Sequence, residues 1–154
     1  MKAKDYLQEI RRLERAISRN RQEKEILYAK LTGRAISYEG NRAQTAGGGD
    51  PMADVIAKVI ELDREISQQT VSYFVRLHEI KGQIERLGND TFSNLLFQRY
   101  VEGKSLEAIA VNMNYTYQHV RRVHGLALQA FEKQFAEKIA EYERCYTMIH
   151  PDVL

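Results

Sequence analysis

Two long stretches of this sequence place apolar residues at alternating intervals of three and four, which is the spacing of one helix face. The first runs from Tyr6 to Leu31 and the second from Met52 to Leu87. Asp50 and Pro51, which are favoured at a helix N-cap and first position, precede the second stretch. A helix of about 37 residues is roughly 55 Å long. A small domain cannot bury the apolar face of such a long helix along its whole length, so we expect the helix to need a partner helix.

Residues 1–89 are therefore expected to form a long antiparallel helical hairpin, resembling a coiled coil, that serves oligomerisation or partner binding. Asn20 and Lys24 interrupt the apolar line of the first helix. A polar residue there either fixes the register of the pair or marks a solvent-facing kink in the stripe. Residues 32–51 lack periodicity and end in a glycine triplet, so we expect a flexible linker. The triplet matches no phosphate-binding loop, because no Gly-Lys-Ser/Thr follows it.

The last third of the chain breaks into shorter helices. Apolar spacing predicts one helix from Asp90 or Thr91, a second capped by Ser105, and a third from Thr116 to Tyr142. Turns at 102–104 and 114–115 separate them. We expect an all-α chain, in which the hairpin is followed by a three-helix, helix-turn-helix domain at 90–142 and a C-terminal tail at 143–154.

The helix-turn-helix interpretation depends on small, apolar and turn-forming residues at fixed positions. A small residue is needed where two helices cross steeply, and a residue that tolerates positive φ must make the turn. Ala110 and Asn114 are expected to fill these two roles, and apolar side chains to fill the crossing. The predicted core consists of Ile109, Ala110, Met113, Asn114, Tyr115, Val120 and Val123.

The start of the third helix carries groups that donate hydrogen bonds to phosphates and base edges. No acidic residue lies between Glu107 and Glu132, whereas an ordinary solvated helix would mix both signs. We interpret this face as a DNA-reading surface placed in a major groove, with Gln118 and Arg121 as base readers. The predicted DNA-binding residues are Thr116, Tyr117, Gln118, His119, Arg121, Arg122 and His124.

Composition argues against other classes of function. The single cysteine, Cys145, excludes an intrachain disulfide, and the four histidines do not form a metal-ligand spacing. No nucleophile signature or paired carboxylates indicate catalysis. No apolar run approaches the roughly 20 residues of a membrane span, and no secretion signal begins the chain. We expect a cytoplasmic protein that is not an enzyme and has no metal, no cofactor, no small-molecule substrate and no membrane partner.

Residues 91–131 resemble region 4 of sigma-70 factors. The resemblance is carried by Leu96-x-x-Arg99-Tyr100, Gly103-x-Ser105-Leu106-x-x-Ile109-Ala110, Met113-Asn114-Tyr115-Thr116, Val120-Arg121 and Ala127-Leu128. The layout is similar to phage-encoded sigma-70 region 4-like regulators of the ArpU and RinA type, except that Asn114 stands where sigma factors usually have glycine. The resemblance implies promoter DNA as the ligand and control of phage or prophage late genes in the bacterial cytoplasm.

The net charge of only +2 predicts modest DNA affinity for a single copy. We therefore expect a homodimer or higher oligomer formed through the long helices, or docking of the hairpin on RNA polymerase. Two other hypotheses fit the pattern. The protein is either a phage DNA-packaging component similar to a small terminase subunit, or a helical protein–protein adaptor without DNA binding.

Overall fold

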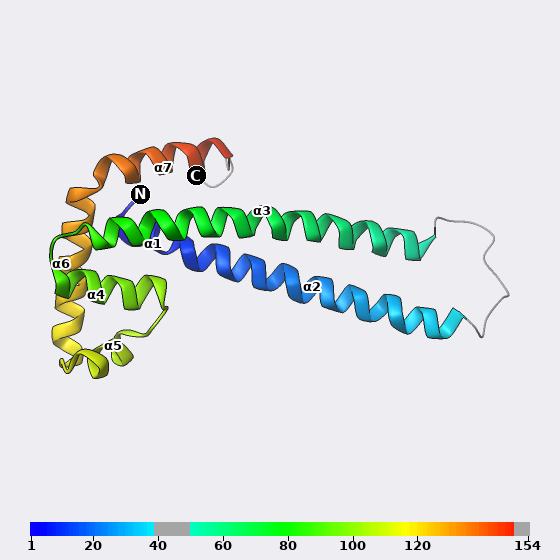
Figure 1. The fold of residues 1–154 in the computed structure, drawn as a ribbon, viewed down its shortest axis with the longest axis horizontal. Helices are drawn as coiled ribbons and strands as arrows, with labels where there is room; N and C mark the ends of the chain where they lie inside the picture. The colour runs from blue at the N-terminus through cyan, green and yellow to red at the C-terminus, as the bar shows by residue number, and fades with distance from the viewer. Residues whose placement is uncertain (39–49, 150–154) are drawn as a thin grey trace. The chain divides into compact units, whose positions relative to one another are not determined.

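The chain folds into helices connected by turns (Figure 1). A computed structural model describes residues 1–38 and 50–149, and these residues contain no β-strand. The prediction of an all-α protein is confirmed. The elements are α1 (Ala3–Leu7), α2 (Glu9–Tyr38), α3 (Pro51–Glu85), α4 (Asp90–Leu96), the π-helix η1 (Phe97–Val101), α5 (Leu106–Met113), α6 (Tyr117–Gln134) and α7 (Ala136–Ile149).

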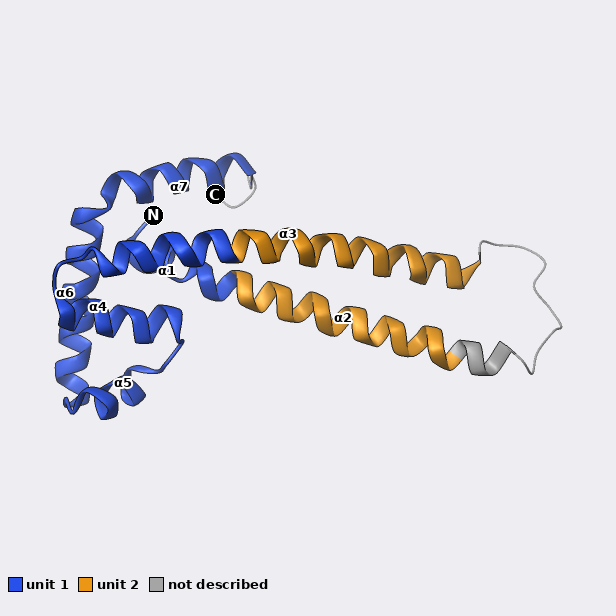
Figure 2. Cartoon of the chain, in the orientation of Figure 1, with its two compact units in different colours: residues 1–12, 74–154 blue, residues 13–73 orange. Residues whose placement is uncertain are grey.

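Two compact units divide the chain (Figure 2). One unit comprises residues 13–73 and the other comprises residues 1–12 together with 74–154. The helices α2 and α3 each contribute to both units. Residues 1–12 and 74–89, which the sequence groups with the long hairpin, thus share a unit with the short helices of the last third.

In the unit of residues 13–73, α2 and α3 run antiparallel, since contacts from later residues of α2 reach earlier residues of α3. Ile17 of α2 and Val59 and Leu62 of α3 are buried in this unit. The 3–4 spacing forms this seam because residues three and four apart lie on one side of a helix. The helix pair of this unit therefore packs along the predicted apolar line.

The two polar interruptions of that line both make contacts between the helices. The side-chain nitrogen of Asn20 donates to Oε2 of Glu65 at 3.2 Å and to Oε1 of Gln69 at 3.1 Å. The ammonium of Lys24 forms a 2.6 Å ion pair with Asp63, which raises the pKa of Lys24. Asn20 is half-buried. These contacts favour the register-fixing interpretation of Asn20 over a solvent-facing kink.

The structure corrects the predicted ends of the first long helix. A turn at Gln8 separates α1 from α2, and α2 continues to Tyr38 instead of ending near residue 31. Residues 32–38, assigned to the linker, are thus helical, because the segment after Gly33 contains helix-compatible residues and no proline. The rest of the predicted linker up to residue 49 lies outside the described residues.

The second unit is built around Tyr6 of α1. Its ring is fully buried and meets the rings of Tyr142 at 5.5 Å and Phe131 at 6.1 Å. Its hydroxyl donates to Oε1 of Gln83 at 3.1 Å, and the guanidinium of Arg76 lies 3.9 Å from the Tyr142 ring centroid. Burial raises the pKa of Tyr6. The first residues of the chain therefore pack into the same core as the last helices.

The prediction of a single helix from Thr116 to Tyr142 is wrong, because the helix is interrupted at Phe135. Phe135 leaves helical geometry with φ of −115° and ψ of 24°, and its ring lies 4.8 Å from that of Phe131. The break directs α7 so that Ile139 is buried and Tyr142 meets Tyr6. The predicted tail is helical as far as Ile149, and residues 150–154 lie outside the described part.

Within the described ranges, none of the helices combines the length and apolar character that a membrane span requires.

Candidate nucleic-acid interface

A tight turn joins α5 to α6, and a side chain caps the start of each helix. The hydroxyl of Ser105 accepts from the backbone N–H of Ala108 at 3.1 Å and starts α5. Asn114 ends α5 in the left-handed conformation, with φ of 56° and ψ of 40°, as its tolerance for positive φ predicts. The hydroxyl of Thr116 accepts from the N–H of His119 at 3.2 Å and starts α6. Sequence alone located all three of these residues.

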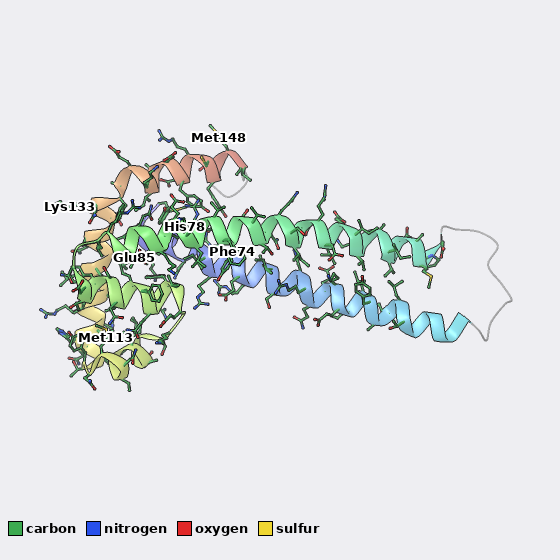
Figure 3. The ribbon with its side chains drawn as sticks, viewed as in Figure 1. Phe74, His78, Glu85, Met113, Lys133 and Met148 are labelled. Atoms are coloured by element: carbon green, nitrogen blue, oxygen red, sulfur yellow. The ribbon has the colours of Figure 1, made fainter. Side chains whose placement is uncertain are left out.

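Side chains from both helices fill the crossing of α5 and α6. Ile109, Ala110, Val120 and Val123 are buried, as expected for the core. Met113, labelled on α5 in Figure 3, is only half-buried. These residues fix the direction in which α6 presents its exposed face.

Tyr115 does not belong to this core. It is 37% exposed, and its ring meets that of His119 edge-on at 4.7 Å. Tyr115 follows Asn114, whose left-handed conformation ends α5. Tyr115 therefore lies in the turn at the surface and not in the crossing of the two helices. The prediction that Tyr115 closes the core is therefore corrected.

A buried glutamine that the sequence pattern does not predict links α5 to the preceding segment through hydrogen bonds. Gln98 is 3% exposed and lies in the π-helix η1, where the N–H of Glu102 reaches the carbonyl of Phe97. Its carbonyl oxygen accepts from Asn112 at 2.7 Å and its amide donates to Asn94 at 2.9 Å. A buried amide needs such partners. No pattern of apolar residues could reveal this link, because all three side chains are polar.

The first turns of α6 form the candidate interface. Four of its side chains are exposed: Tyr117, Gln118, Arg121 and Arg122. His119 is half-buried. The Arg121 guanidinium lies 5.8 Å from the Tyr117 ring centroid, and Arg122 approaches Nδ1 of His119 at 3.5 Å. The amino end of a helix also carries a partial positive charge. This arrangement combines cationic, amide and hydroxyl donors on one solvent-facing surface suited to phosphates and base edges.

One carboxylate lies beside this surface. Glu107 of α5 is exposed, and hydrogen bonds lower its pKa, chiefly from its own backbone N–H and then from Ser105 and Tyr117. A carboxylate at such a place can accept a hydrogen bond from the amino group of cytosine, and it repels phosphate. Glu107 therefore lies at the edge of the candidate interface nearest Tyr117.

His124, predicted among the DNA-binding residues, faces the interior of its unit. Its Nε2 lies 3.0 Å from the hydroxyl of Tyr100, and the two rings stack with centroids 5.9 Å apart. Burial lowers the pKa of His124, and the nearby Arg99 and Lys4 lower it further. Burial raises the pKa of Tyr100 to about 12. His124 lies next to the side of α6 on which Val120 and Phe131 are buried, and its ring contacts Tyr100, so we assign it to packing.

Thr116 also has a structural role, because its hydroxyl is engaged in the cap of α6. The predicted set is thus divided. Tyr117, Gln118, Arg121 and Arg122 share the exposed surface, His119 lies at its border, and Thr116 and His124 support the helix.

The described parts of the chain contain no candidate metal site. Among the residues placed by the structure, no three His, Cys, Asp or Glu side chains lie close enough to hold a metal ion. Cys145 is an exposed free thiol on α7. Comparison with protein-family models, with curated proteins and with solved structures found no match to this chain.

Proposed function

We propose that the protein is a sequence-specific DNA-binding transcription regulator whose α5–α6 pair is a helix-turn-helix of the sigma-70 region 4 kind. The observation that carries this proposal is the exposed, acid-free first half of α6, held by a left-handed turn at Asn114 and a buried crossing with α5. In this account α6 enters the major groove with its amino end foremost. The resemblance of residues 91–131 favours promoters of phage or prophage late genes.

We assign two roles to the side chains of α6, base reading and phosphate binding, from their exposure and chemistry. Gln118 and Arg121 are placed to read base edges, because amide and guanidinium groups can pair with two atoms of one purine. Tyr117 and Arg122 are placed to bind phosphates, which fix the position of α6 on the duplex without reading sequence. His119 supports Arg122.

Two further features belong to the proposal. The long helices bring a second copy, or RNA polymerase, to the promoter, since one domain of this charge binds DNA modestly at cellular salt. The protein acts in the bacterial cytoplasm, as a regulator and not as an enzyme.

Selection of bound duplexes from a randomised library tests this division of roles. We expect wild type to enrich one motif, and Gln118→Ala to relax the preference at a single base pair by about 1–3 kcal/mol. Arg122→Ala is the matched comparison, because loss of a phosphate contact weakens all sequences alike. Failure of wild type to enrich any motif would contradict sequence-specific binding. Absence of any DNA binding at low salt would favour the adaptor hypothesis.

A further inference from the structure

Tyr115, in the turn between α5 and α6, is an aromatic residue at the surface beside the candidate interface. Its side chain is 37% exposed, so burial in the helix crossing does not hold it. Its ring nevertheless has a defined neighbour. It meets the His119 ring with the two centroids 4.7 Å apart and an interplanar angle of 89°. Edge-to-face packing at this distance is one of the preferred geometries of aromatic pairs, so Tyr115 restricts the orientation of the His119 ring.

Two further contacts hold His119. Its backbone N–H donates to the hydroxyl of Thr116 at 3.2 Å, which fixes its place in the first turn of α6. Its Nδ1 lies 3.5 Å from a guanidinium nitrogen of Arg122, three residues further along the helix. A guanidinium only donates hydrogen bonds, so Nδ1 is the acceptor and the ring proton is on Nε2 in this arrangement. His119 therefore connects Tyr115 to Arg122.

Arg122 is an exposed side chain that needs support to keep one orientation. An arginine has many rotamers, and fixing it in one of them costs conformational entropy. No acidic residue lies between Glu107 and Glu132, so no neighbour along α6 offers Arg122 a carboxylate. A side chain that is already held in the free protein loses less entropy when it binds. The contact with His119 can provide this support only while the imidazole keeps its orientation.

We propose that Tyr115 is a positioning residue, whose ring holds the imidazole of His119 so that the guanidinium of Arg122 is oriented toward a DNA phosphate. Tyr115 acts through His119 and does not itself touch the nucleic acid. The edge-on ring contact supplies the orientation, and the tyrosine hydroxyl is not required for it.

This inference deepens the proposed function, on which it rests for the use of Arg122 at DNA. The contacts among Tyr115, His119 and Arg122 lie within the turn and the first turns of α6, and they are present without DNA. The ring contact can therefore be tested on the free protein, and its consequence on the complex.

Fluorescence anisotropy on a duplex selected by wild type and on a scrambled duplex tests the consequence. We expect Tyr115→Ala to weaken binding to both duplexes by a similar factor, about two- to tenfold, because an aromatic pair is lost and a phosphate contact reads no sequence. Tyr115→Phe keeps the ring and should bind as wild type does. Tyr28→Ala removes an exposed tyrosine of α2 and is the matched control.

The decisive comparison is made in an Arg122→Ala background. There we expect Tyr115→Ala to have no further effect on affinity, since no guanidinium remains to be positioned. His119→Ala interrupts the same chain of contacts and should behave like Tyr115→Ala in both backgrounds. A general effect of Tyr115 on the fold would instead weaken binding equally in both. Such an equal loss, or a loss in Tyr115→Phe as large as that in Tyr115→Ala, would overturn the proposal.

Proton NMR of the free protein tests the ring contact without DNA. The ring current of Tyr115 should shift the ring-proton resonances of His119 away from those of His78, an exposed histidine on α3 that serves as the internal reference. We expect the shift to be lost in Tyr115→Ala and kept in Tyr115→Phe. Resonances of His119 that Tyr115→Ala leaves unchanged would overturn the proposal.

The two measurements distinguish this inference from the proposed function. A wild type that has the ring contact but binds no DNA contradicts the regulatory function. Sequence-specific binding that Tyr115→Ala leaves unchanged contradicts only the positioning role of Tyr115.

Discussion

Gly103 combines a positive φ of 72° with a close neighbour, because a Cβ added there would overlap the guanidinium of Arg11. Gly88 has a similar φ of 77°, but a Cβ added there would have no neighbouring atom within 4 Å. The two glycines therefore separate backbone strain from crowding. Sequence alone marks both as turn residues, but the approach of Arg11, which is distant along the chain, depends on the tertiary structure.

We expect Gly88→Ala to lower the free energy of unfolding by about 1–2 kcal/mol, which is the strain of a left-handed alanine. Gly103→Ala is expected to lower it further, because Arg11 must also move. Chemical denaturation measures both values. In an Arg11→Ala background the two substitutions should have the same effect. A persistent difference there would show that crowding by Arg11 is not the cause.

His124 makes stability depend on pH. Burial lowers its pKa in the folded protein, so the unfolded chain binds the proton more tightly. The free energy of unfolding should therefore fall as pH decreases from about 6.5, the value of an unfolded histidine, through the folded pKa. We expect His124→Gln to lose this dependence. The measurement is the difference in unfolding free energy between wild type and variant from neutral to acidic pH, and a constant difference would contradict the buried histidine.

Asn114 and His124 show what single residues reveal in a sequence. The left-handed turn at Asn114 could be predicted because only a few residue types tolerate positive φ. The burial of His124 could not, because it depends on Tyr100 of another helix, and hydropathy does not report such pairs.

At the scale of elements, the polar contacts between α2 and α3 differ in how far they are buried. Asn20 is half-buried and donates to two acceptors on α3, whereas Lys24 and Asp63 form a more exposed pair. A hydrogen bond lost from a partly buried site matters more than an exposed ion pair, which water and salt screen. The register of the helix pair should therefore depend chiefly on Asn20.

We expect Asn20→Ala to lower the free energy of unfolding by about 1–3 kcal/mol, since the Glu65 carboxylate loses a partner. Lys24→Ala should have a smaller effect that disappears at high salt. Thermal or chemical unfolding at low and high salt distinguishes the two. Equal effects of both substitutions would contradict the assigned role of Asn20.

Helix positions followed from apolar spacing, but two of their breaks did not. The turn at Gln8 and the bend at Phe135 interrupt continuous helical patterns, so periodicity predicts helix through both. Packing decides these places. The bend at Phe135 brings Ile139 and Tyr142 into the unit that contains Tyr6. Tertiary contacts override local propensity at such points.

At the scale of the whole molecule, the division into two units crosses the long helices. The start of α2, residues 9–12, and the last part of α3, residues 74–85, belong to one unit, and their parts within residues 13–73 belong to the other. The sequence indicates where helices lie, but not which buried stripe each segment joins, because a 3–4 pattern is the same in both units. Tyr6 is an example: it lies on the predicted seam, yet it packs with α6 and α7.

The central claim is that the first turns of α6 bind DNA and read its sequence. Fluorescence anisotropy with a selected duplex and a scrambled duplex, at several salt concentrations, tests it most directly. The Arg121→Ala, Arg122→Ala double variant is compared with Lys133→Ala, Arg144→Ala, which removes the same charge from exposed positions elsewhere. We predict tighter binding to the selected duplex, lost only in the first double variant, with a salt slope shallower by about 0.9 for each phosphate contact removed. Equal, weak binding to both duplexes, unchanged by Arg121→Ala and Arg122→Ala together, would contradict the account.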